Sequence, residues 1–225
     1  MKTKLISFAL IIMLTGSLAI AQDNESQKMS FAILGGVNFQ NLNGKDHSGN
    51  KLTNNILTGY HGGINIQIPI APDFYFQPGV LYSTKGARSI IGSLTYTYNL
   101  SYFEVPLNLV YRTRLGNGKI MIGFGPYVGY GIGGKITTVG GDVTLETKVV
   151  FQNVVELSDP VLTTYYKSLD AGGNIFAGYE MASGLFLQVN TQFGILKINP
   201  ENKWFSNDKA SLNNTGFGLS LGFRF

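Results

Sequence analysis

The chain ends in Gly216-Phe217-Gly218-Leu219-Ser220-Leu221-Gly222-Phe223-Arg224-Phe225, a stretch in which every second side chain is bulky and apolar. Successive side chains of a β-strand point to opposite faces, so this alternation predicts a strand with one apolar face and one face of glycine, serine and arginine. The same alternation recurs at 185–196 and 119–132. The sequence therefore predicts long β-strands with two chemically different faces.

The length of these strands and the composition indicate that the apolar faces meet lipid. The alternating runs extend over about 10–14 residues, whereas strands of soluble proteins cluster near 5–6 and membrane strands need about 9–11. Only 13% of the 225 residues are charged, about half of the usual share of roughly 25%. Glycine is abundant, with 29 residues, and so are rings, with 15 Phe, 12 Tyr and one Trp. This combination favours a β-barrel with lipid outside and a crowded, glycine-lined interior.

Eight segments of the chain carry the strand pattern. We expect them to form an all-β fold, an eight-stranded antiparallel up-and-down transmembrane β-barrel. The segments are 30–40, 57–68, 74–85, 94–112, 119–134, 168–181, 185–198 and 212–225.

The connections between the segments alternate strictly between short and long. This alternation is typical of outer-membrane barrels, which have tight periplasmic turns and longer extracellular loops. An even strand number then places both termini on the periplasmic side, so we expect an outer-membrane location with extracellular long loops. The short connections are 69–73, 113–118 and 182–184, and the longer ones are 41–56, 86–93, 135–167 and 199–211.

Two regions depart from the simple pattern. In the fourth segment the apolar phase changes at Tyr102-Phe103, which we interpret as a β-bulge or as a bend where the strand leaves the bilayer. The long connection 135–167 contains a further alternating stretch at 143–151. It predicts either an extracellular hairpin that extends the barrel wall or two additional membrane strands, which would make ten.

The first 21 residues predict a cleaved secretory signal peptide. Lys2 and Lys4 form a positive start, an apolar run follows, and Ala19-Ile20-Ala21 is an A-x-A cleavage site. The alternative is a membrane anchor helix, but about 16 apolar residues are short for one. We therefore predict cleavage after Ala21.

The remaining residues 22–225 form the predicted barrel domain. Removal of two lysines leaves 15 Lys and Arg against 13 Asp and Glu, a balance that gives no case for nucleic-acid binding. The expected partners are outer-membrane lipid, the barrel-assembly machinery and another envelope or secretion protein, and we expect a monomer. Phe223 and Phe225 close the chain in the alternating pattern with which many outer-membrane barrels end, and they resemble the signal that the assembly machinery reads.

Three stretches resemble the PorT-like outer-membrane β-barrel family of Gram-negative bacteria. Residues 76–86 (F-Q-P-G-V-L-Y-S-T-K-G) resemble its F-Q-P-E-L-L-Y-S-x-K-G stretch, and 102–107 (Y-F-E-V-P-L) resemble its Y-L-E-I-P-L stretch. Residues 125–130 (G-P-Y-V-G-Y) are similar to its G-P-Y-x-G-Y stretch. Gly79 departs from the family, which often has Glu there. The resemblance covers essentially the whole mature chain and implies a barrel. Its founding member is implicated in type IX protein secretion, a role that fold alone does not transfer.

The alternation also predicts which polar residues fill the lumen. Lys119 and Glu180 are expected to pair across neighbouring strands, with Arg112 close by. An eight-stranded barrel is just wide enough for its own side chains, so we expect a closed lumen and an accessory or structural envelope role. The alternative is a porin that passes small solutes. The predicted lumen network consists of Glu104, Arg112, Lys119, Asp170, Glu180 and Arg224.

The sequence offers no basis for catalysis. The absence of cysteine excludes a thiol nucleophile and a zinc–thiolate site. His47 stands between Asp46 and Ser48, but adjacent side chains on an extended loop point in different directions and cannot form a Ser–His–Asp relay. We therefore expect no enzyme, no catalytic or metal-binding residue and no cofactor.

Overall fold

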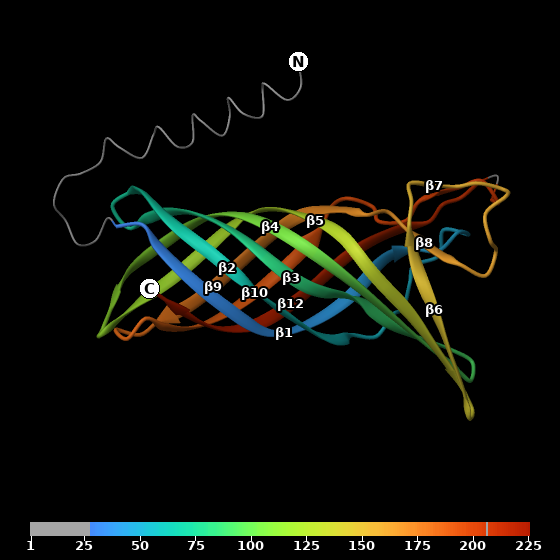
Figure 1. Cartoon of the computed structure of the whole chain (residues 1–225), viewed down its shortest axis with the longest axis horizontal. Coiled ribbons are helices and arrows are strands. Elements are labelled where there is room, and N and C mark those ends of the chain that lie inside the picture. Colours follow the sequence, from blue (N-terminus) through green and yellow to red (C-terminus); the bar gives the residue numbers. More distant parts are fainter. Residues whose placement is uncertain (1–27, 206) are drawn as a thin grey trace, which may run out of the picture.

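The computed structural model describes residues 28–205 and 207–225, so the predicted signal peptide with Ala19 and Ala21 lies outside the described residues. The described part of the chain contains β-strands (Figure 1). No helix in this part is long and apolar enough to cross a membrane. The strands are β1 (Ser30–Lys45), β2 (Leu57–Ala71), β3 (Phe74–Ile91), β4 (Leu94–Leu115), β5 (Gly118–Gly140), β6 (Val143–Phe151), β7 (Val154–Val155), β8 (Thr164–Tyr166), β9 (Leu169–Glu180), β10 (Leu185–Gly194), β11 (Glu201–Asn202) and β12 (Ser211–Arg224).

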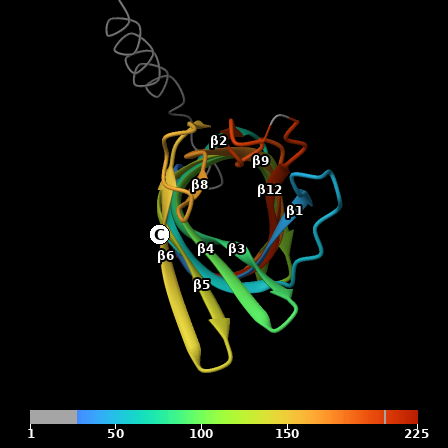
Figure 2. The same ribbon diagram turned by 90° about the vertical axis from the view of Figure 1, so that its right-hand side faces the viewer.

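Eight long antiparallel strands close into a ring, which Figure 2 shows end-on. Their order is β1, β2, β3, β4, β5, β9, β10 and β12, and β12 pairs with β1 from Ala32↔Arg224 to Lys45↔Ser211. The prediction of an eight-stranded barrel is confirmed. The ten-stranded alternative is wrong, because β6 and β8 join the sheet beside β5 without entering the ring.

The two faces of each strand differ as the alternation predicted. In β12, Phe217, Leu219 and Leu221 are exposed on the outside, while Ser220 and Arg224 are buried inside. On β3 and β4 the outward apolar stretches each cover nine residues, from Phe74 to Tyr82 and from Phe103 to Tyr111. Nine residues agree with the roughly 9–11 that a tilted strand needs to cross a bilayer.

One end of the barrel, here called the turn end, holds both chain ends of the barrel domain and three short connections. The opposite end, here called the loop end, is less regular than predicted. The connection 86–93 is not a loop, because β3 continues to Ile91 and β4 begins at Leu94 after a turn at Gly92-Ser93. Gly92 has a φ of 60°, which glycine adopts without strain.

Half of the connection 135–167 also belongs to the wall. β5 pairs with β9 from Lys119 to Tyr130 and then with β6 from Lys135 to Gly140. The predicted hairpin extension is thus present, and Figure 2 shows the β3–β4 and β5–β6 hairpins projecting beyond the ring. These four strands form a sheet that continues past the closed part of the barrel, here called the extended wall.

A register shift lies beside the phase change at Tyr102-Phe103, as the β-bulge interpretation predicts, but its extra residue is on the neighbouring strand β5. Even-numbered residues of β4 stay buried from Leu100 to Arg112, so β4 itself does not reverse its faces. The register shift lies opposite Ser101/Tyr102, where Ile132 is the extra residue on β5. The apolar phase changes because the inner face of β4 is apolar at Leu100 and Tyr102 and polar at Glu104.

Two layers of buried apolar side chains cross the interior. The layer nearer the turn end consists of Ala32, Tyr75, Val110, Met121, Phe176 and Phe186, with Leu34 packed against it. The layer at the loop end consists of Leu42, Ala87, Leu100, Tyr102, Tyr166 and Ile198. Tyr166 and Ile198 come from the loop-end segments, which are fixed to the barrel by backbone hydrogen bonds from Lys167 to Ile198 and from Ile198 to Leu212.

Candidate functional site: the polar lumen

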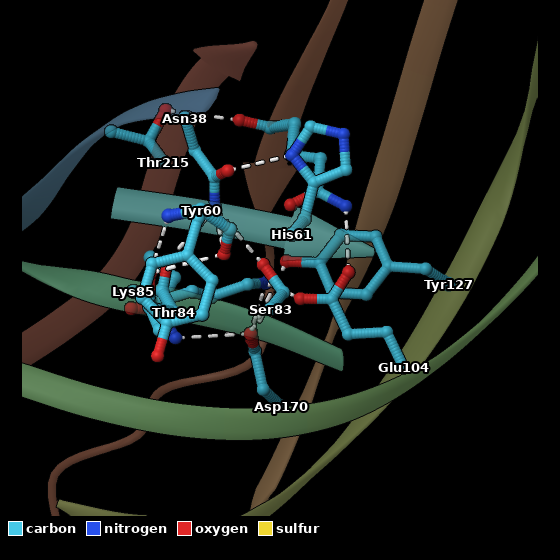
Figure 3. A network of polar contacts seen from close by, with 12 residues as sticks. Asn38, Tyr60, His61, Ser83, Thr84, Lys85, Glu104, Tyr127, Asp170 and Thr215 are labelled. Carbon is cyan, nitrogen blue, oxygen red and sulfur yellow. Dashed lines mark hydrogen bonds and ion pairs between the residues drawn. The ribbon is translucent and has the colours of Figure 1, made fainter. Parts of the chain in front are cut away.

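A buried ionic cluster lies beside the loop-end apolar layer. The Lys85 ammonium is 2.7 Å from Glu104 Oε1 and 2.9 Å from Asp170 Oδ2, and all three side chains are at most 1% exposed. Figure 3 shows them with Tyr127, whose ring centroid is 4.3 Å from Lys85 Nζ. Charges this deeply buried are costly to desolvate, so their mutual contacts are needed to keep them in place. We call these three residues the outer triad.

Neighbouring amides complete the outer triad. Gln192 Nε2 donates to Glu104 Oε2 at 2.9 Å, and Asn214 Nδ2 donates to Asp170 Oδ2 at 3.0 Å. These donors come from β10 and β12, whereas Lys85 belongs to β3. The cluster therefore joins opposite sides of the barrel through its interior.

A second cluster lies at the turn end. Glu180 binds Arg112 through Oε1, and its Oε2 accepts a hydrogen bond of 2.9 Å from Arg224 Nε. The guanidinium groups stack near the apolar layer, with Arg112 Cζ 5.7 Å from the Tyr75 ring centroid and Arg224 Cζ 5.6 Å from that of Phe186. We call Arg112, Glu180 and Arg224 the inner triad.

The predicted ion pair between Lys119 and Glu180 is wrong, because Glu180 pairs with Arg112 and Arg224 instead. Lys119 and Glu180 are register partners on β5 and β9, as the hairpin geometry predicted. The Glu180 carboxylate nevertheless binds the two arginines, because their side chains reach inward from β4 and β12. Lys119 is half-buried at the rim, next to the turn at Gly116-Asn117.

The structure thus places five of the six predicted network residues inside the lumen in two clusters. Lys85 was missed, although it shares the inward parity of Gln77 and Ser83 on the same strand. The formal charge of the outer triad is −1 and that of the inner triad is +1, so the two clusters balance each other. The assignment of these residues to a functional network stays a prediction.

A small polar cavity separates the two triads. It has a volume of about 60 Å³ and extends from Phe176 of the apolar layer nearer the turn end to Glu104 of the outer triad. His61 lies on its wall, with Nδ1 2.6 Å from Asn38 Oδ1 and Nε2 2.7 Å from Ser220 Oγ. A cavity of this size has room for on the order of four waters.

The loop end carries a separate, larger hollow. It has a volume of about 630 Å³ and is lined by rings that include Tyr98 and Tyr166. Trp204 packs edge-on against Tyr165 with ring centroids 6.2 Å apart, within this hollow. We call it the loop crevice.

The loop that contains Asp46, His47 and Ser48 lies at the rim of the loop crevice. His47 stacks on Phe205 at 4.2 Å, and its Nδ1 is 2.8 Å from Asp208 Oδ1. Asp46 instead accepts hydrogen bonds from Asn50, which hold the pKa of Asp46 below its ordinary value. His47 therefore pairs with Asp208 rather than with its sequence neighbour. Within 28–205 and 207–225, no group of three or more His, Cys, Asp or Glu residues is placed to hold a metal ion.

The predicted assembly signal lies on the outer surface at the turn end. Phe223 and Phe225 have ring centroids 5.0 Å apart, and Phe225 is 72% exposed. Phe74 and Tyr111 form a similar pair at 5.2 Å on the outside of β3 and β4. Aromatic side chains thus gather at the turn-end border of the apolar surface.

Comparison with known proteins adds a family match. A model described as "Outer membrane protein beta-barrel domain" matches residues 20–199, which are 180 of the 225 residues. No curated protein matches the chain significantly.

Several solved structures are similar to the chain. Ail, the attachment invasion locus protein of Yersinia pestis, is 12% identical, with a TM-score of 0.39 over 88% of this chain and 99% of Ail. Neisserial surface protein A is 12% identical, with a TM-score of 0.42 over 88% and 97%. An outer membrane channel from Pseudomonas putida F1 is 10% identical, with a TM-score of 0.29 over 91% and 100%.

Proposed function

Because the chain belongs to the outer membrane protein beta-barrel domain family, it is an outer-membrane β-barrel protein. We propose that its lumen is closed to solutes and that it functions through its loops. The observation that carries this proposal is the pair of apolar layers that cross the interior. Side chains such as Val110 and Leu100 are 0% exposed in these layers. A hydrated solute would have to pass both layers in series.

The space between the layers also supports a closed lumen. The cavity of about 60 Å³ is far smaller than a conducting path, and the ionic triads hold opposite walls together on both sides of it. A barrel of eight strands is expected to be filled by its own side chains. The loop crevice, with about 630 Å³, is about ten times larger than this cavity and is open to a partner or ligand.

Single-channel recording tests the closed lumen. Purified protein in a planar lipid bilayer should give no stable conductance steps, while circular dichroism shows that it is folded. Reproducible steps would overturn the proposal and favour the porin that passes small solutes.

The proposal includes an orientation, with the turn end periplasmic and the loop end extracellular. The chain lacks cysteine, so single cysteines at Asn117 in a turn and at Leu157 in a loop report on the two sides. Leu157 is 74% exposed, so its replacement is accessible. On intact cells a membrane-impermeant maleimide should label Leu157→Cys and spare Asn117→Cys, and the reverse pattern would refute the orientation.

The resemblance of residues 76–86, 102–107 and 125–130 to PorT-like barrels supports a narrower proposal. In it, the protein assists protein secretion or another envelope process together with a partner in the envelope. The test is deletion of the gene, followed by measurement of secreted protein and of envelope integrity. Secretion that matches the parent strain, with an intact envelope, would remove this role. The signal peptide cleaved after Ala21 is part of the same proposal, and a mature chain that starts at Gln22 is its expected readout.

A further inference from the structure

The outer surface of the extended wall changes chemistry sharply at one level. On β3 and β4 the apolar stretch ends at Tyr82 and Phe103, which are register partners with ring centroids 6.1 Å apart. Tyr60 on β2 lies beside Tyr82 at 5.9 Å. Rings of this kind mark the border between hydrocarbon and headgroups in membrane barrels.

Immediately beyond this aromatic border the outward positions become polar and basic. Lys135 on β5 and Lys148 on β6 are direct cross-strand partners. Like charges placed opposite each other repel, so this register is unfavourable unless an anion lies between or beside them. Arg88, exposed on β3, adds a third positive charge farther along the same wall.

One carboxylate partly compensates these charges. Glu146 accepts a hydrogen bond of 2.6 Å from Lys135, and this contact lowers the pKa of Glu146. The hydrogen bonds and ion pairs of the described residues give Lys148 no acidic partner. Lys135, Lys148 and Glu146 together therefore carry a formal charge of +1.

The same surface is hollow. A concave space of about 660 Å³ lies between the aromatic border and the two lysines. Gly133 and Gly134 form part of its floor, and a Cβ at Gly133 would have nothing within 4 Å. Hydroxyl and amide groups of Thr84, Asn99 and Ser101 line its wall.

We propose that this hollow binds the anionic, phosphate-bearing headgroup of a membrane lipid whose acyl chains lie on the apolar surface below Tyr82 and Phe103. The positive charge, the Asn99 amide on the wall of the hollow and the position directly above the apolar band all match this ligand. A protein partner would find the band below occupied by lipid. The inference rests on the proposed function in one respect, since the orientation decides that the lipid is one of the outer leaflet.

Native mass spectrometry of the purified full-length protein in detergent tests the site. The probes are phosphatidic acid, phosphatidylglycerol and phosphatidylcholine with identical acyl chains. The two anionic lipids should bind more tightly than zwitterionic phosphatidylcholine. Each lysine near a phosphate contributes about fivefold, so K135Q/K148Q should weaken phosphatidic acid binding about 30-fold.

K45Q/K51Q is the matched control, because Lys45 and Lys51 also form an opposed bridge at the loop end but lie outside the hollow. It should change the affinity by less than about twofold, as expected for lysines remote from the lipid phosphate. Equal loss in both double variants, equal binding of phosphatidylcholine, or displacement of the lipid by equimolar inorganic phosphate would overturn the site.

Failure of the lipid-binding test can be distinguished from failure of the proposed closed lumen and orientation. Single-channel recording on the K135Q/K148Q protein, and maleimide labelling of K135Q/K148Q that also carries Leu157→Cys or Asn117→Cys, report the lumen and the orientation independently of lipid affinity. A silent, correctly oriented variant that binds lipid like the wild type overturns the headgroup site alone.

Discussion

Glu180 on β9 accepts a hydrogen bond of 2.9 Å from Arg224 on β12, although β10 lies between these two strands. The other carboxylate oxygen binds Arg112 on β4, on the far side of β5. One buried carboxylate therefore links three strands that are not neighbours. These links run through the lumen and are independent of the backbone ladder that closes the ring.

Glu180→Gln should destabilise the barrel more than a surface substitution of the same kind. It leaves Arg112 and Arg224, at 9% and 6% exposure, as buried cations without a counter-charge. Breaking a buried pair in this way costs about 3–5 kcal/mol of unfolding free energy. Urea unfolding in lipid vesicles, followed by circular dichroism, measures the loss. Glu146→Gln is the control, since its pair with Lys135 is half exposed, and a similar loss in both variants would contradict the role of the inner triad.

Lys85→Met should have an effect of similar size at the other triad. The substitution retains an apolar chain but leaves Glu104 and Asp170 buried together without a cation, at a cost of about 3–5 kcal/mol. Lys85→Met/Asp170→Asn should recover part of the unfolding free energy, because one of the two carboxylates is then neutral. Lys135→Met, at an exposed site, should cost at most about 1 kcal/mol. Failure of the double variant to recover stability would show that lost packing, not charge, dominates.

The strand pattern was predictable because lipid and lumen impose opposite demands on alternate residues. Phe217, Leu219 and Leu221 must be apolar outside, while Ser220 and Arg224 can be polar inside, so the alternation itself carries the fold. The closed part of the barrel follows from such segments. Beyond Tyr82 no lipid constrains the outer face of β3, and the alternation of β3 fades after Lys85. This is why β3 and β5 were predicted too short at the loop end, whereas the start of β4 at Leu94 was predicted correctly.

The lumen clusters were predictable only in part. Parity identifies which side chains point inward, as it did for Arg112 and Glu180, but not which of several cations reaches one carboxylate. Lys119 is the register partner of Glu180, yet two longer, planar guanidinium groups occupy the carboxylate. Lys85 was missed because it ends an alternating segment in the sequence, whereas in the structure its strand continues for six more residues to Ile91.

The ring of Phe176, the register partner of Gly123, occupies the space that any side chain at position 123 would need. We therefore expect that only glycine is tolerated there without loss of stability. A Cβ at Gly123 would lie 2.4 Å from two atoms of this buried ring. Gly123→Ala should therefore cost about 1–3 kcal/mol through overpacking, measured by urea unfolding in vesicles. Gly133→Ala, where the added Cβ has open space, should be nearly neutral. Phe176→Leu should relieve the strain of Gly123→Ala, and an additive loss in that double variant would argue against the contact.

Conduction is expected only when both apolar layers are opened. The two layers lie in series, so opening either layer alone leaves the path blocked by the other. Tyr102→Ala/Tyr166→Ala opens the loop-end layer, and Phe176→Ala/Phe186→Ala opens the layer near the turn end. Each pair alone should give silent bilayers, while the combined variant should give conductance steps. Truncation of a buried ring costs about 3–5 kcal/mol, so circular dichroism must first show that each variant retains its strand content. Steps from one pair alone would mean that only that layer seals the barrel, and silence from a folded combined variant would assign the seal to the ionic triads instead.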